Sequence, residues 1–434
     1  MKAKIYPLEK INNEVNVFPS TFASHLAIIC ASLAVGKSVL KNVASSSDID
    51  VTISWCKQIG ATIYKKKDAL IVIGFSNKDD EEKAKRIINI NSSIFECGDS
   101  SITAKLMIPL LSTFAQPVGI KANKKTIQEL HPFLEKLENN SVTYIEFENL
   151  IRIEKRLTTF KEDLQGKEDV YMAAGFLLAF PFIRGKNSIC LHAPVNNFDD
   201  YLAISKLMRK FKIEVKHPSS MVFEIEGYQK YNSCVYTVEN DPLNICFMAL
   251  LLNKFKEDKK HKNKIKLLNY SNSFTFDIHK ILDIYKKNLF ILSKGKIKLK
   301  NQFLNKIDVS TTNYIIPFLY VYGTINQNDT LLYNIKIDNK EVIEVIKLMN
   351  GIFTKLELPY SFIANDVVIK PGSVNLKKQV ETNKNPYVVM ALSYLALLSN
   401  SPIIIKDAQA VYSINDKFFE QIKGLGGKVE LIHN

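Results

Sequence analysis

Paired cysteines, histidines at ligand spacing and long apolar runs are all missing from this sequence. The six cysteines are scattered, with no C-x-x-C pair, and most of them lie in apolar segments. This pattern predicts reduced core cysteines, typical of a cytoplasmic protein, and neither a disulfide framework nor a zinc site. The seven histidines show no ligand spacing, so no metal ion or other cofactor is expected.

Segments that would target or anchor the protein are also missing. The N-terminus alternates polar and apolar residues as a strand does, and it has no signal-peptide core. The longest apolar run, from Tyr171 to Ile183, is too short to span a bilayer and indicates a buried helix. No stretch rich in Pro, Gly or Ser divides the chain. We therefore expect a protein without a membrane partner, whose domains are tightly connected.

Charge of one sign is in excess. The chain has 58 Lys and Arg against 44 Asp and Glu, a net charge of +14. Such a balance attracts anionic partners, but the lysines are spread along the chain without a basic stripe interleaved with aromatics. A solvated basic surface is the expectation, and nucleic acid is not an expected partner. The lysine runs at Tyr64–Lys67 and Lys256–Lys264 are predicted to be exposed loops.

Six apolar helices are predicted at regular intervals. Their starts lie 67 to 79 residues apart, at His25, Ala104, Tyr171, Leu243, Tyr314 and Tyr387. Each is apolar on nearly every face, which predicts that protein surrounds it on all sides. A strand, an amphipathic helix and two further strands follow most of them, and the first amphipathic helix is expected to begin at an N-cap, Asp48.

This periodicity predicts an α/β fold of two domains, built from six helix-strand-helix-strand-strand repeats. One domain is expected to contain residues 1–20 and 239–434, which carry repeats four to six, and the other residues 21–238. The strand "EVNVF" (14–18) has no helix before it. We expect it to complete the sheet of the last repeat and bring the termini together.

The first repeat, "SHLAIICASLAVGKSVLKNVASSSDIDVTISWCKQIGATI", resembles the opening of the enolpyruvyl transferase family. "FECGDSSITAKLMIPLL" and "YVVMALSYLALLSNSPIIIKD" resemble later family segments, and the resemblance covers essentially the whole chain. It is best for the 5-enolpyruvylshikimate-3-phosphate synthases. It implies an inside-out α/β barrel fold, a monomer, and phosphorylated small-molecule substrates in an interdomain cleft. The implied reaction transfers enolpyruvyl from phosphoenolpyruvate to shikimate 3-phosphate, in aromatic amino acid biosynthesis.

The resemblance also implies candidate site residues. Lys340 and Glu341 match part of the family's catalytic loop, and Asn313 falls near an expected aspartate. The candidates for substrate binding are Ser24, His25, Asp99, Ser100, Lys105, Lys124 and Asp241. Structural alternatives stay open for all of them. Ser, Asp and Asn cap helices in any protein, whereas helix N-termini that face a cleft bind anions.

Several of the family's charged or polar groups are absent. Thr21 and Leu26 stand at a family lysine and arginine, and Tyr387 stands at the arginine of an Asp-His-Arg motif. Further departures are Gln128, Tyr171 and Ser413. A guanidinium presents a planar fork to phosphate that none of these side chains reproduces.

Three hypotheses follow. The first is a divergent enolpyruvyl transferase acting on shikimate 3-phosphate or another anionic alcohol. The second is a catalytically inactive member that acts as a binding or regulatory partner. The third, a nucleic-acid-associated protein, rests on distant fold kinship with RNA 3′-phosphate cyclases and is disfavoured by the charge pattern.

Overall fold

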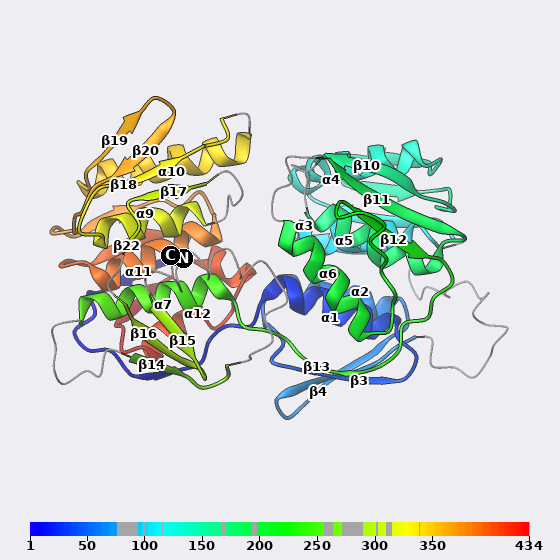
Figure 1. Ribbon diagram of the computed structural model, residues 1–434, viewed down its shortest axis with the longest axis horizontal. Coiled ribbons are helices and arrows are strands. Elements are labelled where there is room, and N and C mark those ends of the chain that lie inside the picture. The colour runs from blue at the N-terminus through cyan, green and yellow to red at the C-terminus, as the bar shows by residue number, and fades with distance from the viewer. Residues whose placement is uncertain are drawn as a thin grey trace. The chain divides into compact units, whose positions relative to one another are not determined.

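A computed structural model describes the chain as two compact units. The described residues are 1–75, 94–98, 100–114, 116–165, 170–192, 198–255, 264–270, 290–300, 303–309, 315–337 and 339–433. Residues Pro19–Glu239 form one unit, here called the inserted unit. Met1–Phe18 and the described residues from Asn240 onward form the other, the terminal unit. Figure 1 shows the inserted unit in blue to green.

Each unit is built around three apolar helices. In the inserted unit these are α1 (Thr21–Leu33), α3 (Ser101–Leu111) and α5 (Val170–Ala179), the last followed by the 3₁₀ turn Phe180–Phe182. In the terminal unit they are α7 (Pro242–Lys254), α9 (Ile316–Ile325) and α11 (Pro386–Leu398). Nearly every residue of these helices is buried. The six predicted inner helices are thus confirmed.

Amphipathic helices cover the inner ones. They are α2 (Ser47–Gln58), α4 (Lys124–Asn139), α6 (Phe198–Lys210), α10 (Lys340–Leu356) and the short α12 (Phe418–Gly424). A 3₁₀ segment, Ala408–Ser413, precedes α12. The N-cap of α2 is Ser46, whose Oγ accepts from Ile49 N–H, and not Asp48 as expected. Asp48 instead lies in the first turn, where its charge favours the positive end of the helix dipole. The expected fourth amphipathic helix, at residues 276–288, lies outside the described residues.

Three sheets surround the inner helices of the inserted unit. Their strand orders are β13-β3-β5-β4, β6-β7-β9-β8 and β10-β11-β12. The bounds are β3 Lys37–Lys41, β4 Thr62–Lys66, β5 Ala69–Ile73, β6 Ile94–Gly98, β7 Val118–Ala122, β8 Tyr144–Phe147, β9 Leu150–Ile153, β10 Lys161–Gln165, β11 Lys186–His192, β12 Val222–Glu226 and β13 Val235–Thr237. In Figure 1 the sheet with β3, β4 and β13 lies on one side of these helices, and the sheet with β10, β11 and β12 lies on the other. The exposed run Tyr64–Lys67 is the end of β4 and its turn, and not a loop as predicted.

The terminal unit repeats this plan. Its sheets have the orders β15-β16-β14-β2, β17-β18-β20-β19 and β21-β22-β1-β23. The bounds are β1 Lys2–Ile5, β2 Glu14–Val15, β14 Lys264–Leu267, β15 Phe290–Ser293, β16 Lys296–Leu299, β17 Lys306–Asp308, β18 Thr330–Tyr333, β19 Tyr360–Ile363, β20 Asp366–Ile369, β21 Lys378–Val380, β22 Ile403–Lys406 and β23 Val429–Ile432. In the lysine run Lys256–Lys264, residues 256–263 lie outside the described part.

The strands that flank the inner helices are exchanged at two places. Around α3, α5, α9 and α11, the strand before the helix pairs in parallel with the strand after it. At α1 and α7 these partners are swapped: β2 pairs with β14, and β13 pairs with β3. The exchange assigns the strand before α1 to the terminal unit and the strand before α7 to the inserted unit.

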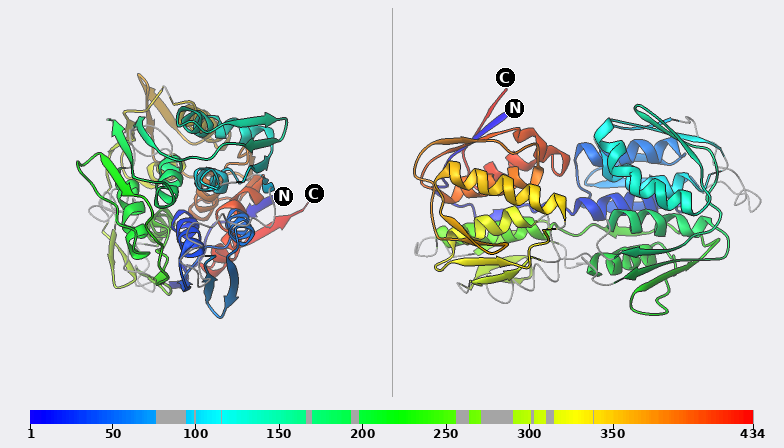
Figure 2. Two further views of the ribbon diagram at one scale, coloured as in Figure 1. Left: turned by 90° about the vertical axis from the view of Figure 1, so that its right-hand side faces the viewer. Right: turned by 90° about the horizontal axis from the view of Figure 1, so that it is seen from above.

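The N-terminal strand differs from its prediction. Only Glu14–Val15 of "EVNVF" form a strand, and they join the sheet of the fourth repeat. The sheet of the last repeat is completed by β1, which pairs antiparallel with both β22 and β23. Ala3 and Ile5 of β1 are buried and the intervening lysine is not, the alternation of a strand covered on one face. The termini do lie side by side (Figure 2).

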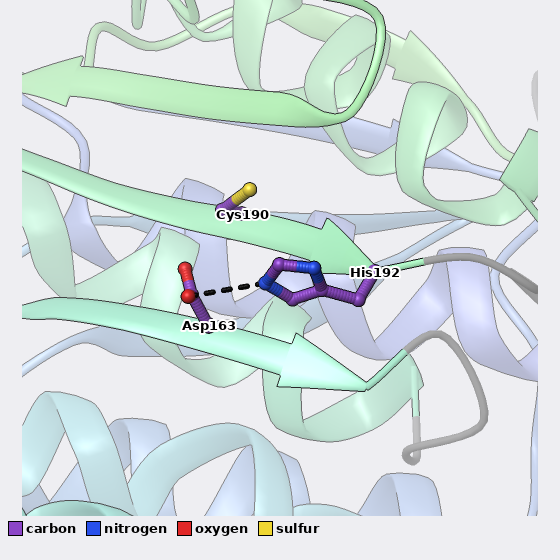
Figure 3. A group of neighbouring side chains, drawn as sticks. All are labelled: Asp163, Cys190 and His192. Carbon is purple, nitrogen blue, oxygen red and sulfur yellow. Dashed lines mark ion pairs between the residues drawn. The ribbon is translucent and has the colours of Figure 1, made fainter.

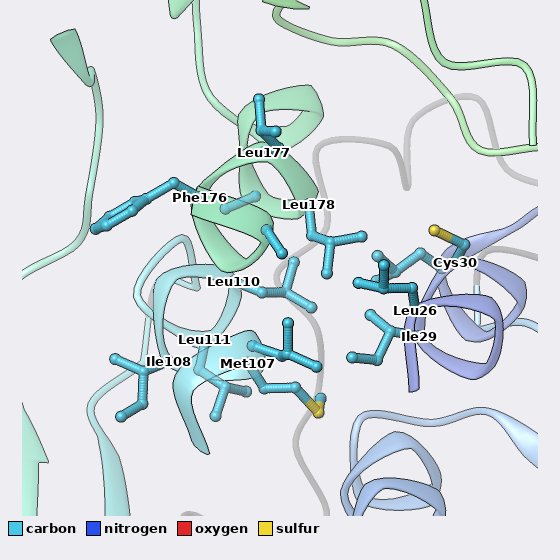
Figure 4. Packing of buried hydrophobic residues seen from close by; sticks show 14 of the residues in the cluster. Leu26, Ile29, Cys30, Met107, Ile108, Leu110, Leu111, Phe176, Leu177 and Leu178 are labelled. Carbon is cyan, nitrogen blue, oxygen red and sulfur yellow. The ribbon is translucent and has the colours of Figure 1, made fainter. Parts of the chain in front are cut away.

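Close approach of α3 and α5 requires glycine at position 175. Pro109 has no N–H to donate to the carbonyl of Lys105, and this carbonyl oxygen faces α5. A Cβ added to Gly175 would lie 2.5 Å from that oxygen. Figure 4 shows the apolar side chains of α1, α3 and α5 that pack between the helices at this level.

Gly175→Ala is therefore expected to destabilise the protein by about 1–3 kcal/mol through overpacking. This holds although alanine favours helix by about 1 kcal/mol over glycine. Urea denaturation followed by circular dichroism measures the change. Gly351→Ala in α10, where an added Cβ meets nothing within 4 Å, is the matched control and should stabilise by about 0.5–1 kcal/mol. Two changes of the same sign would contradict this account of α3 and α5.

Candidate functional site

The start of α1 is fixed by two serines. Ser20 is the N-cap, and its Oγ accepts from Ala23 N–H at 3.2 Å. Ser24 Oγ donates to the Ser20 carbonyl at 2.8 Å and accepts from Ala44 N–H at 2.9 Å. Because both bonds are structural, Ser24 holds the helix start against the loop before α2. A role in substrate binding stays a prediction for this residue.

A chain of buried polar side chains joins α1, α2 and α3. His25 Nδ1 lies 2.7 Å from Thr52 Oγ1, which lies 2.7 Å from Thr103 Oγ1. Thr103 Oγ1 lies 3.2 Å from Ser100 Oγ, at the N-cap of α3, and 3.3 Å from the Asp48 carbonyl. The structure thus joins two predicted site residues, His25 and Ser100, through two threonines that the sequence analysis did not single out.

The direction of these bonds assigns the tautomer of His25. If Thr103 donates to the Asp48 carbonyl, it accepts from Thr52, and Thr52 then accepts the proton of His25 Nδ1. The unprotonated Nε2 is buried and has no hydrogen-bond partner in the described structure. Burial lowers the pKa of His25 to about 3, so the ring is neutral at physiological pH.

The two predicted lysines of the inserted unit differ in environment. Lys105 lies in α3, its side chain is only 14% exposed, and its Nζ lies 3.9 Å from Glu129 Oε2. Lys124 is the exposed first residue of α4, next to the N-cap Asn123. Partial burial makes Lys105 the better placed of these two cations to act on a ligand in a medium of reduced polarity.

Asp241 is the N-cap of α7 in the terminal unit. Its Oδ1 accepts from Asn244 N–H at 2.8 Å. Burial raises the pKa of its carboxyl to about 6, although N–H donors of the helix start favour the charged form. The Asn244 side chain continues inward, donating to Tyr394 at 3.2 Å and to Gln421 at 3.1 Å. A carboxyl that titrates near neutral pH is suited to proton transfer.

The remaining predicted residues are Lys340, Glu341, Asn313 and Asp99. Lys340 and Glu341 open α10 and are exposed, and Lys340 Nζ lies 3.9 Å from Glu344 Oε1. Among the described residues, no recorded hydrogen bond or ion pair connects them to Asp241. Asn313 and Asp99 lie outside the described residues.

Several positions where the resemblance implies charged or polar family residues take part in local packing or capping here. Leu26 is fully buried in the apolar core (Figure 4). The Tyr171 ring packs edge-on against Phe22 at 4.9 Å, and Ser413 Oγ donates to the Ala410 carbonyl. Tyr387 N–H is bound by the N-cap Asn385, while Thr21 begins α1 and Gln128 is exposed on α4.

Solved structures with this arrangement define the class of protein. An EPSP synthase from Acinetobacter baumannii aligns with a TM-score of 0.77 at 15% identity, covering 100% of both chains. An enolpyruvyl transferase from Streptomyces tendae aligns with a TM-score of 0.71 at 12% identity, covering 99% of this chain and 98% of the other. At such identities the likeness shows the fold alone, which is that of the enolpyruvyl transferases. The predicted fold class is confirmed.

Sequence comparison narrows the class to a family. The family model described as EPSP synthase (3-phosphoshikimate 1-carboxyvinyltransferase) matches residues 5–422. A 3-phosphoshikimate 1-carboxyvinyltransferase of Clostridioides difficile is 25% identical, with 98% of each chain covered. One from Clostridium botulinum is 26% identical, covering 98% of this chain and 97% of the relative. The chain belongs to the EPSP synthase family.

Within the described residues, none of the helices is long and apolar enough to cross a membrane.

Thr52→Val tests the polar chain. Valine keeps the shape of the side chain but leaves His25 Nδ1 without its buried partner and removes the bond between position 52 and Thr103. A loss of about 1–3 kcal/mol in the free energy of unfolding is expected. Thr354→Val on the exposed face of α10, which removes bonds to the Asn350 carbonyl and the Tyr360 hydroxyl at the surface, is the control and should change stability by less than about 0.5 kcal/mol. Equal losses in the two variants would show that the buried chain of hydrogen bonds adds nothing to the stability of the protein.

Asp241→Asn tests the raised pKa of Asp241. The folded-state pKa of about 6 exceeds the unfolded value, so this group's contribution is fully present below about pH 4 and is lost as pH rises through 6. Asparagine caps a helix as well as aspartate and carries no charge. The variant should therefore gain about 2–3 kcal/mol relative to the parent between pH 4 and pH 7. Urea denaturation at several pH values measures this, and a pH-independent difference would rule out the raised pKa.

Proposed function

We propose that this protein transfers the enolpyruvyl group of phosphoenolpyruvate to shikimate 3-phosphate. The observation that carries the proposal is the end-to-end family match, which runs from residue 5 to residue 422. Relatives named for this activity align over 97–98% of their own length. All six cysteines are free, which supports placing the protein in a reducing compartment, the cytoplasm.

Both substrates are anions, so binding requires cations or oriented N–H groups. In the inserted unit, the N-cap Ser100 makes no side-chain hydrogen bond to the N–H groups at the start of α3, and N–H groups of a helix start can bind an anion. Lys105 lies on the same helix and supplies a partly buried positive charge. We assign the binding of a substrate phosphate or carboxylate to these groups. Anion binding by these N–H groups and by Lys105 does not depend on the family arginine that Leu26 replaces.

The reaction also requires transfer of protons. The acceptor hydroxyl loses its proton as its oxygen bonds to the central carbon of phosphoenolpyruvate, whose C=C π bond opens while the methylene carbon takes up a proton. The C–O bond to phosphate then breaks as the methylene carbon gives that proton up and the double bond re-forms. In the net balance, phosphate leaves with the proton that the hydroxyl gave up. A group with a pKa near neutral can accept that proton and return it. Asp241, with its pKa raised to about 6, is the residue we assign to this role.

A second function, ligand binding without turnover, is favoured by one specific observation. Leu26 has no exposed surface, so the position of the family's arginine belongs to the core of this protein. Loss of one charge clamp in a water-excluded site costs about 3–4 kcal/mol of transition-state stabilisation. In that case the protein would hold the same anions as a sensor or as a regulatory partner.

Phosphate release with phosphoenolpyruvate and shikimate 3-phosphate tests the first function, and calorimetry with each ligand tests the second. Lys105→Met is expected to lower kcat/KM, or ligand affinity if there is no turnover, by about tenfold to a hundredfold. Lys125→Met is the matched control and should change neither, because Lys125 also lies 3.9 Å from Glu129 but is 85% exposed.

Each outcome decides between the two functions. Turnover that falls only in Lys105→Met supports enolpyruvyl transfer. Binding without turnover, again weakened only in Lys105→Met, supports the sensor. A protein that neither binds nor turns over these ligands has neither function, and equal effects of the two lysine variants would remove Lys105 from the site.

A further inference from the structure

Three side chains of types that bind zinc meet on the third sheet of the inserted unit. Strands β10 and β11 are parallel, with Asp163 opposite Cys190 and residue 165 opposite His192. Along β11, Ile189 and Leu191 are buried, and Cys190 and His192 alternate with them. The period of two places Cys190 and His192 on the same face of the sheet, the face turned away from the apolar core.

The geometry of the group is close to that of a ligand set. His192 Nε2 lies 3.1 Å from Asp163 Oδ2. One ligand atom from each of Asp163, Cys190 and His192 lies within 4.8 Å of the other two (Figure 3). In a tetrahedral zinc site with bonds of 2.0–2.3 Å, ligand atoms lie about 3.5 Å apart. Reaching that spacing requires rotation of the side chains, and the two ion-paired side chains lie at the surface, since Asp163 is 68% exposed and His192 47% exposed.

We propose that Asp163, Cys190 and His192 bind one zinc ion, with water at the fourth position. Thiolate and imidazole are the ligands that zinc prefers, and a carboxylate completes a three-ligand set of the open type. Binding replaces the Cys190 S–H bond by a Zn–S bond, and the thiol proton passes to solvent. Lys136 Nζ donates to the backbone carbonyl of Asp163 at 3.3 Å.

The sulfur is what distinguishes this group from other pairs on the same unit. His131 Nε2 lies 3.0 Å from Glu146 Oε2, also at the surface, and among the described residues that pair is not part of a metal-binding group of three. It therefore offers a control in which imidazole and carboxylate are present without a thiolate. Cys234, half-buried in the same unit, offers the complementary control of a thiol without the other two ligands.

A zinc ion here would cross-link an edge strand. Among the described strands, β10 is at the edge of its sheet and pairs with β11 alone. The ion would join Asp163 of β10 to Cys190 and His192 of β11, shortly before the chain enters α5. Binding to the folded state alone raises its stability according to the ligand concentration. Zinc should therefore raise the melting temperature and shield Cys190 from alkylation, whether or not the protein is an enzyme.

Metal titration of the full chain, freed of metal by a chelator, tests the proposal. One equivalent of Co²⁺ should produce a thiolate-to-cobalt charge-transfer band, and one equivalent of Zn²⁺ should abolish it. Cys190→Ser should abolish the band, whereas His192→Ala and Asp163→Asn should each weaken zinc binding by about tenfold to a hundredfold. His131→Ala and Cys234→Ser should leave the band and the affinity unchanged.

A second readout uses no variant, in case Cys190→Ser fails to fold. Zinc should slow iodoacetamide alkylation of Cys190 at least tenfold in the parent protein, measured by peptide mass spectrometry, and should not slow alkylation of Cys234. Absence of the charge-transfer band, or a band that survives in Cys190→Ser, overturns the proposal. So does a loss of zinc affinity in His131→Ala that equals the loss in His192→Ala, and so does unprotected alkylation of Cys190.

Discussion

Enclosure of helices that have no polar face is the constraint on which this structure depends. A helix that is apolar all round cannot lie at a surface, so each inner helix needs neighbours on every side. Sheets and amphipathic helices supply these neighbours within each unit. At α1 and α7, the sheets that enclose the helices use exchanged strands, since β2 pairs with β14 and β13 pairs with β3. The terminal unit therefore cannot complete its sheets from one continuous stretch of chain, because β1 and β2 come before the inserted unit in the sequence.

Enclosure also restricts where polar groups can stand. A buried polar atom without a partner is costly, so polar residues of the inner helices must find bonds within the protein. Asn244 of α7 does so through Tyr394 and Gln421. His25 of α1 does so at Nδ1 but not at Nε2. Near the helix starts, burial lowers the pKa of His25 and raises the pKa of Asp241. These are the places where a fold of this kind can hold reactive groups.

The inner helices could be predicted from the sequence because their signal is local. The run from Tyr171 to Ile183 is apolar along its length, and it is buried as α5 and the following 3₁₀ turn. Partners distant in the chain left no such signal. "EVNVF" alternates as a strand does, but the sequence does not indicate which sheet edge it joins. In the structure its first two residues pair with β14. Ser46 and Asp48 are both good caps, and only the backbone conformation decides between them.

The candidate site was predictable to a smaller extent. Family resemblance pointed to His25 and Ser100. The two threonines that connect them, Thr52 of α2 and Thr103 of α3, match no sequence motif. Asp163 is 27 residues from Cys190 in the chain, a separation outside the short spacings of zinc motifs. Parallel pairing of β10 with β11 brings the two residues opposite each other in the sheet. A group of ligands that strand pairing brings together cannot be predicted before the register of the strands is known.

Position 26 connects the fold to the function. In the resemblance, this position holds an arginine that binds a substrate anion, and here it holds a leucine with no exposed surface. An arginine at that place in this core would bury a charge without a partner, which costs far more than it returns. Under the proposed function, the resemblance at position 26 therefore implies one charge clamp fewer. The groups that we assign to anion binding are ones that the apolar core does not require, the N–H donors at the start of α3 and the Lys105 ammonium. Because one lysine and a helix start bind anions less tightly than a set of bidentate arginines, the proposal implies weaker binding of the substrate anions than such a set would give.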